Sequence, residues 1–216
     1  MTGGRPEFIF GGKQAKIRFG EEEIRFVQEQ PFPLYPGEKL MGQVKKQPFI
    51  PKDTAFLVQA LADFTDNFGT KPCKRSAGEQ WLVKGPKTYN DRVEVKMLST
   101  VRARNVGTGC ALMLMAQRSL VDANGVKRKA GERWLIRQEG AYLPRLYEQV
   151  IEIVKGVIIT HNNALQVRAK SDFTDYYGTK RRAGEEWLIT NDMAEVHIVD
   201  VYEESVKTVY NTILSK

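Results

Sequence analysis

The sequence contains few cysteines and histidines, the residues that form disulfides and metal sites in small proteins, and it contains no long apolar run. Only two cysteines, Cys73 and Cys110, and two histidines, His161 and His197, occur in 216 residues, and they lack the spacing of a zinc site. No segment approaches the roughly 18 apolar residues of a membrane-spanning helix. We therefore expect two free thiols in a reducing compartment, with a disulfide as the less favoured alternative.

The sequence also lacks the motifs of common enzyme classes. GGKQ at 11–14 is missing the upstream glycine and the Ser or Thr of a P-loop, and GTGC at 107–110 is an incomplete dinucleotide motif. No G-x-S-x-G elbow is present. We expect no catalytic residues, no metal and no cofactor. The N-terminal residues show no apolar stretch before a cleavage site, so we expect no signal peptide and a protein inside the cell.

Two acidic turns, DFTDNFG at 63–69 and DFTDYYG at 172–178, contain residue types that bind calcium. An EF-hand loop places acids at positions 1, 3 and 5 and glycine at 6. Here the acids fall at positions 1 and 4, and glycine falls at 7. We favour β-turns capped by aspartate side chains, and calcium binding stays open.

What the sequence does contain is one motif in three copies: RSAGEQWLV at 75–83, RKAGERWLI at 128–136 and RRAGEEWLI at 181–189. Successive copies are 53 residues apart, and every tryptophan of the chain lies in one of them. A catalytic centre rarely needs three copies of itself, whereas a stacked packing unit does.

Each repeat has the pattern of short strands. In NALQVRAK at 163–170, apolar residues alternate with polar ones, as in a half-buried strand, and turn residues follow. We predict an all-β fold, a linear array of small antiparallel modules of about 53 residues. The predicted boundaries are 1–46 for a partial repeat, 47–100, 101–155 and 156–210 for three full repeats, and 211–216 for a tail.

The positions that are the same in all three copies of the motif predict structural anchors. The glycine can adopt a turn conformation that is unfavourable for other residues. The tryptophan adds a large apolar surface to the core of a module that is too small to bury much apolar area otherwise. The glutamate is expected to bind turn amides or to pair with a neighbouring Arg or Lys rather than to act in catalysis. We expect the three tryptophans to be equivalent. These anchors are Trp81, Trp134, Trp187, Gly78, Gly131, Gly184, Glu79, Glu132 and Glu185.

The first strand of two repeats has apolar residues on both faces. A strand in a small two-layer module should have one face that is exposed to solvent and therefore polar. In the last repeat the second face is polar, whereas in the earlier two it carries the candidate interface residues Leu57, Leu61, Met113 and Met115. Either a helix or loop of the same module covers this face, or a neighbouring module or a neighbouring chain does, and methionine suits such a surface.

The net charge of +7 favours binding to an acidic partner such as RNA. Basic residues are interleaved with acidic ones, however, and no dedicated basic arm is present. A basic adaptor for RNA or acidic proteins is therefore the alternative function, and solvated surface charge is the simpler interpretation.

Several longer motifs resemble the N-terminal repeats of the major vault protein family. They are QPFPLYPGEKL at 30–40, the AGExWL repeats, GPKTYNDRVEV at 85–95 and EGAYLPRLYEQVIEIV at 139–154. The resemblance runs from about residue 16 over nearly the whole chain. In the last repeat, AEVHIVDVYEESV at 194–206 takes the place of the YLP segment.

This resemblance implies a structural protein. Repeats of the family are small antiparallel β domains that stand side by side as staves in the wall of a hollow ribonucleoprotein barrel. The implied partners are the chain itself or a full-length major vault protein, together with other vault components that include RNA; no membrane and no small-molecule substrate is implied. The implied location is the cytoplasm and in part the nucleus. Family members are far longer and continue to a shoulder and a cap helix, which this sequence does not show.

Overall fold

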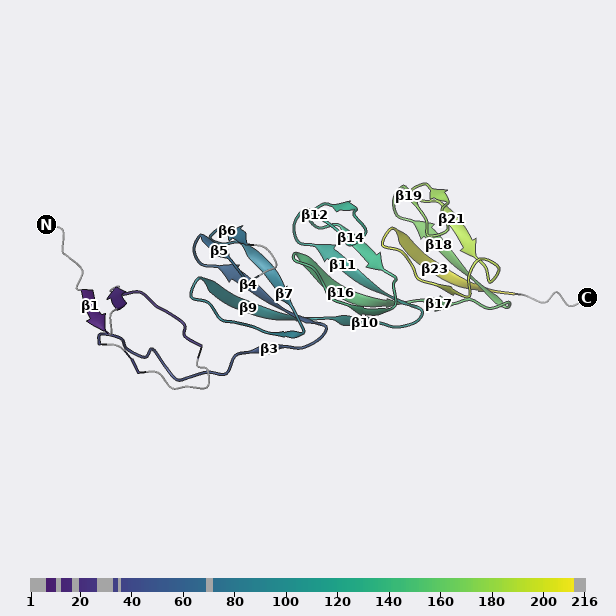
Figure 1. Cartoon of the computed structure of the whole chain (residues 1–216). Helices are drawn as coiled ribbons and strands as arrows, with labels where there is room; N and C mark the ends of the chain where they lie inside the picture. Colours follow the sequence, from purple (N-terminus) through teal and green to yellow (C-terminus); the bar gives the residue numbers. More distant parts are fainter. Residues whose placement is uncertain are drawn as a thin grey trace, which may run out of the picture. The chain divides into compact units, whose positions relative to one another are not determined.

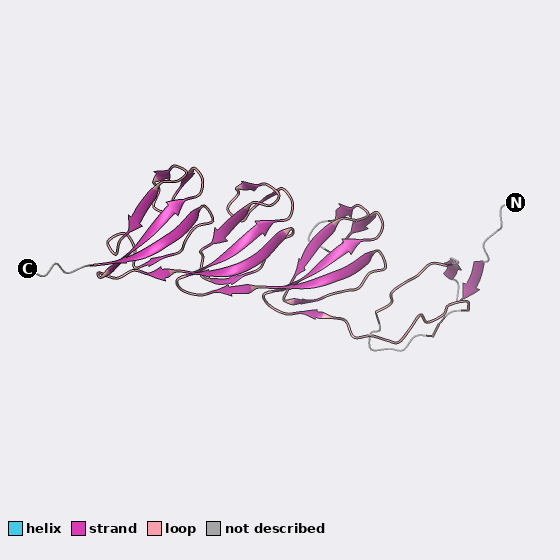
Figure 2. Ribbon diagram, turned by 180° about the vertical axis from the view of Figure 1, so that it is seen from behind, coloured by secondary structure: helices cyan, strands magenta, loops and turns pink. Residues whose placement is uncertain are grey.

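The computed structural model describes residues 7–10, 13–16, 20–26, 33–34, 36–68 and 72–211. All regular secondary structure in these residues is β-strand (Figure 2). The strands pair in small sheets of two or three, and every pairing with a determined register is antiparallel. The prediction of an all-β fold built from small antiparallel modules is confirmed. The described part of the chain contains no helix that could cross a membrane.

Seven strands in one repeated order form each of three modules (Figure 1). Module 1 contains β3 (Phe49–Ile50), β4 (Thr54–Ala60), β5 (Phe64–Asp66), β6 (Cys73–Arg75), β7 (Gln80–Lys84), β8 (Lys87–Thr88) and β9 (Val95–Arg102). Module 2 contains β10 (Arg104–Val106), β11 (Cys110–Ala116), β12 (Leu120–Val121), β13 (Lys127–Arg128), β14 (Arg133–Ile136), β15 (Gly140–Tyr142) and β16 (Glu148–Lys155). Module 3 contains β17 (Val157–Ile158), β18 (Asn163–Ala169), β19 (Phe173–Thr174), β20 (Lys180–Arg181), β21 (Glu186–Ile189), β22 (Val196–His197) and β23 (Glu203–Tyr210).

The main sheet of each module has three strands, in the orders β7-β4-β9, β14-β11-β16 and β21-β18-β23. The first long strand is central, the strand that carries the tryptophan lies on one edge, and the eight-residue strand lies on the other. Two smaller two-stranded sheets accompany it in each module, for example β10-β15 and β12-β13 in module 2.

Alternation along the central strand decides which face becomes the core. In β11 the side chains of Leu112, Leu114 and Ala116 are fully buried, while Met113 and Met115 on the second face are half-buried. The strand predicted at 163–170 is β18, and its buried residues alternate as expected. Each module thus has its own small apolar core.

The chain divides into two compact units, residues 1–52 with 56–100 and residues 53–55 with 101–216. Modules 2 and 3 lie together in the second unit. In the first unit, β1 (Glu7–Phe10) forms an antiparallel hairpin with β2 (Lys13–Lys16). Part of the 30–40 motif lies outside the described residues.

Both cysteines are free thiols: Cys73 is exposed and Cys110 is half-buried. The loop after Gly69 lies partly outside the described residues.

Candidate functional site

An arginine at the centre of the repeated motif holds the turn and the tryptophan strand together. In module 2, Arg128 donates from Nε to Asp122 Oδ2 at 2.9 Å and from Nη1 to Glu132 Oε1 at 2.7 Å. Its guanidinium also lies over the indole of Trp134, 5.3 Å from the ring centroid. One side chain therefore joins the β12–β13 turn, the Ala-Gly turn and the core.

Module 3 repeats this cluster, which we call the arginine clamp. Arg181 donates to Asp175 at 2.9 Å and to Glu185 at 2.8 Å, and lies 4.3 Å over the Trp187 ring. In module 1, Arg75 pairs with Glu79 and lies 4.5 Å over Trp81, but its Nε is 3.9 Å from Asp66, beyond hydrogen-bonding distance. The clamp of module 1 is therefore looser.

The aspartate of the clamp is a buried turn cap. Asp122 is 2% exposed and accepts from the amides of Asn124 and Val126 at 2.8 and 3.0 Å. Burial alone would raise the pKa of Asp122, but hydrogen bonds from Val126, Arg128 and Asn124 hold that pKa below its usual value. Asp175 accepts two turn amides and an arginine in the same way, so its oxygens serve the turn. The described residues contain no cluster of three or more His, Cys, Asp or Glu side chains that could hold a metal ion.

The glutamate of the motif binds both predicted types of partner. Glu132 Oε2 accepts from the Lys129 amide at 2.9 Å while Oε1 receives Arg128. The arginine hydrogen bond, and then the amide, lower the pKa of Glu132. Glu79 and Glu185 have lowered pKa values for the same reasons. The turn glycines Gly78, Gly131 and Gly184 have φ of +83°, +81° and +81°, a conformation that favours glycine.

The three tryptophans are not equivalent, and the expectation that they are is wrong. Trp134 is 4% exposed and belongs to the module 2 core, whereas Trp81 and Trp187 are half-buried. The residues that pack beside the three tryptophans differ. Leu120 packs in the module 2 core, and the corresponding positions of modules 1 and 3 are Phe64 and Phe173. The rings of Phe64 and Phe173 are tilted by 42° and 43° to their indoles, with ring centroids 6.3 Å apart in both pairs.

Leu57, Met113 and Met115 lie on the second face of the main sheets, and Leu61 follows the end of β4. Met113 stands between Leu135 and Glu152 in the pairing register, and Met115 stands between Arg133 and Gln149. Both methionines and Leu57 are half-buried, and Leu61 is 57% exposed.

The same face of module 3 is polar. There Arg168 pairs with Glu186 across the strands, and Gln166 donates to Glu186 at 2.6 Å. At the two central positions of this face, module 2 has methionines and module 3 has a glutamine and an ion-paired arginine.

A contact that the sequence did not indicate joins modules 2 and 3. Arg137 of module 2 donates to the carbonyl of Ile198 at 3.0 Å and to Asp200 Oδ2 at 2.8 Å, and lies 4.6 Å over the Tyr176 ring. The Gly156 amide donates to Gly109 at 2.8 Å. A Cβ at Gly156 would approach Val196 to 2.4 Å, so glycine is required there. Lys84 and Thr190 occupy the position of Arg137 in the other repeats, which is why no repeat signal revealed it.

Acid should destabilise the protein through the clamps. A carboxyl whose pKa is lower in the folded than in the unfolded state adds stability above its unfolded pKa, about 3.9 for Asp and 4.3 for Glu. That contribution is lost as the pH falls through the lowered folded pKa. For Asp122, Glu132, Glu79 and Glu185 the expected loss therefore begins near pH 4 and grows below it.

Thermal melts between pH 7 and pH 2.5 measure this loss. Asp122→Asn is the matched variant, because it should lower the melting temperature at pH 7 and weaken the dependence on acid pH. An unchanged melting temperature down to pH 2.5 would contradict the role assigned to the clamps.

Comparison with known proteins gives matches along nearly the whole chain. The sequence profile described as the Major Vault Protein repeat domain matches residues 48–90, 104–145 and 157–195, and a second profile with that description matches residues 10–44. Major vault protein alpha of Dictyostelium discoideum is 46% identical over 203 residues, which is 94% of this chain and 24% of that protein. The major vault protein of Gallus gallus is 41% identical over 204 residues, which is also 94% of this chain and 24% of that protein. That of Trypanosoma cruzi (strain CL Brener) is 45% identical over 192 residues, 87% of this chain and 22% of that protein. The chain spans about a quarter of the length of these relatives.

Proposed function

Because this chain belongs to the major vault protein family, we propose that it is a structural, non-enzymatic wall module that associates side by side with copies of itself or with a full-length major vault protein. The observation that carries this proposal is the pair of partly exposed methionines, Met113 and Met115, on the second face of module 2. Met113 and Met115 are already partly buried in the free chain, so burying the exposed remainder of both at a contact is worth about 1–2 kcal/mol before association costs.

The repeated modules support a partner of the same kind. Modules 1 and 2 both carry apolar residues on the second face, and another array with the same period can match both of them. Single weak contacts then add along the length of the pair, as in other multivalent associations. We place the protein in the cytoplasm and in part in the nucleus, in a particle whose other components include RNA.

Size measurement in solution tests this proposal. Sedimentation velocity at micromolar concentration, with negative-stain imaging of the same samples, should show species larger than the 24.6 kDa chain. Mixing with full-length major vault protein should place the chain in the same particles. A chain that stays strictly monomeric and also fails to join those particles contradicts the proposal.

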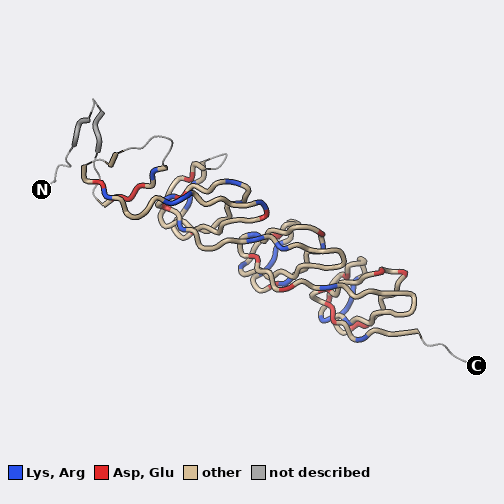
Figure 3. The backbone as a smooth tube through the Cα atoms, turned by 90° about the horizontal axis from the view of Figure 1, so that it is seen from below, with Lys and Arg blue, Asp and Glu red and all other residues tan. Residues whose placement is uncertain are grey.

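The charge of module 2 favours a second candidate function, a basic adaptor for RNA. Residues 103–155 contain nine basic and five acidic residues, whereas residues 156–210 contain six and nine. Basic and acidic residues are interspersed along the backbone of both modules (Figure 3). RNA binding that weakens steeply with salt, in a chain that does not associate with itself, would favour this candidate.

A further inference from the structure

The hairpin turn of module 2 contains the one Asn-Gly pair of the sequence, Asn124-Gly125. This turn joins β12 to β13, and its residues from Ala123 to Val126 are exposed. Gly125 has φ of +80°, and a Cβ at this glycine would meet no atom within 4 Å. The main chain that follows Asn124 is therefore unshielded by a side chain and open to water.

Asp122 holds this turn through three main-chain amides. Its Oδ1 accepts from the Asn124 and Val126 amides at 2.8 and 3.0 Å, and its carbonyl accepts from the Gly125 amide at 3.1 Å. For Asn124, the described part of the chain shows a hydrogen bond only through the backbone amide. Its side chain is therefore free to turn toward the Gly125 nitrogen when the longest of these bonds opens, and exposed loop tips open at low cost.

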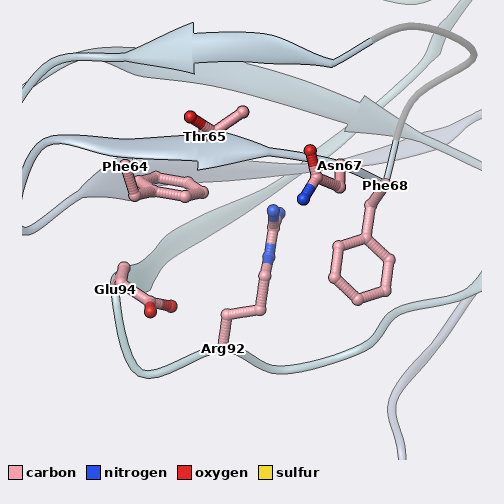
Figure 4. A pocket seen from close by; sticks show the side chains of 6 residues that line it. All are labelled: Phe64, Thr65, Asn67, Phe68, Arg92 and Glu94. Atoms are coloured by element: carbon pink, nitrogen blue, oxygen red, sulfur yellow. The ribbon is translucent and has the colours of Figure 1, made fainter.

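Aromatic residues take the place of Asn124 in the corresponding turns of the other two modules. In module 1 this residue is Phe68, and the Arg92 guanidinium lies 4.8 Å from its ring centroid (Figure 4). In module 3 it is Tyr177, whose hydroxyl lies 2.9 Å from His197 Nδ1. Each ring contacts a residue from outside the turn, and neither side chain carries an amide. Of the three turns, the one in module 2 has the reactive side chain.

We propose that Asn124 is a deamidation site specific to the module 2 turn. The Gly125 amide nitrogen loses its proton to base and attacks Cγ of Asn124; a C–N bond forms, and the side-chain nitrogen leaves as ammonia. The five-membered succinimide ring that results takes up water, which breaks one of its two C–N bonds. Breaking the bond to Cγ gives aspartate. Breaking the bond to the main-chain carbonyl carbon gives isoaspartate, in which the main chain continues through Cβ and Cγ.

Isoaspartate at this position disturbs the arginine clamp of module 2. It adds one methylene group to the main chain between residue 124 and Gly125, so the Val126 amide moves relative to the Asp122 carboxylate. The same carboxylate accepts from Arg128 Nε at 2.9 Å, and the change therefore extends from the exposed turn to the clamp. Aspartate at residue 124 keeps the normal main chain and leaves these hydrogen bonds in place.

Peptide mass spectrometry of the folded full chain after incubation tests the site. Tryptic cleavage after Arg118 and Lys127 releases residues 119–127, in which Asn124 is the one asparagine. This peptide should gain the mass of an amide-to-acid conversion, faster at pH 8.5 than at pH 6.5, and an isoaspartate-specific methyltransferase should label it. The peptide 105–118, whose one asparagine precedes Val106, is the internal control and should stay unmodified. If residues 119–127 of the folded chain stay unmodified, the proposal is overturned, whether or not the chain reacts in urea.

Two variants separate the modification from a general effect on the fold. Asn124→Tyr gives module 2 the residue that module 3 has in this turn, and it should lose the mass gain. Asn124→Asp carries the new charge on a normal main chain, and hydrogen exchange of residues 119–127 should match that of the fresh chain, whereas chain enriched in isoaspartate should exchange faster. Modified chain that exchanges no faster than fresh chain overturns the effect on the clamp. A mass gain in residues 119–127 that persists in Asn124→Tyr overturns the site itself.

Discussion

Replacing Trp134 by alanine is expected to lower the free energy of unfolding of module 2 by about 3–5 kcal/mol, the usual cost of truncating a buried large aromatic. The side chain is 4% exposed and packs in a cluster with Leu112, Leu114 and Ile136. Truncation also removes the ring under the Arg128 guanidinium, which is 5.3 Å from its centroid. A module with so small a core has few other contacts to compensate for this loss.

The matched variants are Trp187→Ala and Glu132→Gln. Trp187 is half-buried, so its truncation should cost less than that of Trp134. Glu132→Gln should cost about 1 kcal/mol, the size of a hydrogen bond, because the amide oxygen still accepts. Hydrogen exchange resolved by peptide is the suitable measurement, since the two compact units need not unfold together. Equal and small losses for all three variants would show that the packing account is wrong.

Replacing Met113 by lysine together with Met115 by glutamate is expected to leave a folded chain that no longer associates. The new charges fall beside opposite ones, because position 113 pairs with Glu152 and position 115 pairs with Arg133. Such cross-strand pairs stabilise a sheet, so the module should keep its structure. The apolar contact is lost, and its value of about 1–2 kcal/mol corresponds to a dissociation constant raised by about one order of magnitude.

Val121→Lys with Val126→Glu is the control for this double variant. These residues of module 2 are 54% and 45% exposed near the β12–β13 turn, away from the second face. The control should associate like the wild-type chain in sedimentation velocity. If the methionine variant unfolds, the second face belongs to the module's own core; if it associates normally, the contact lies elsewhere on the chain.

The sequence by itself determined the repeat, the strands and the face that each central strand buries. The 53-residue period appears as repeated letters, and the alternation of Leu165, Val167 and Ala169 is a local signal that any half-buried strand must carry. The motif glutamate and glycine were also predictable, because their partners lie within a few residues in the same turn.

Only the tertiary structure decided which of these residues are buried, and against what. The pairing of Arg128 with Asp122 depends on how the β12–β13 turn folds back over Trp134, and the unequal burial of the tryptophans depends on neighbours from another strand. The bond from Arg137 to Asp200 joins residues 63 positions apart in two modules. A local sequence pattern indicates that a side chain will be buried or will have a polar partner. Which residue becomes that partner depends on the packing of strands that are distant in the sequence, and a local pattern contains no information about that packing.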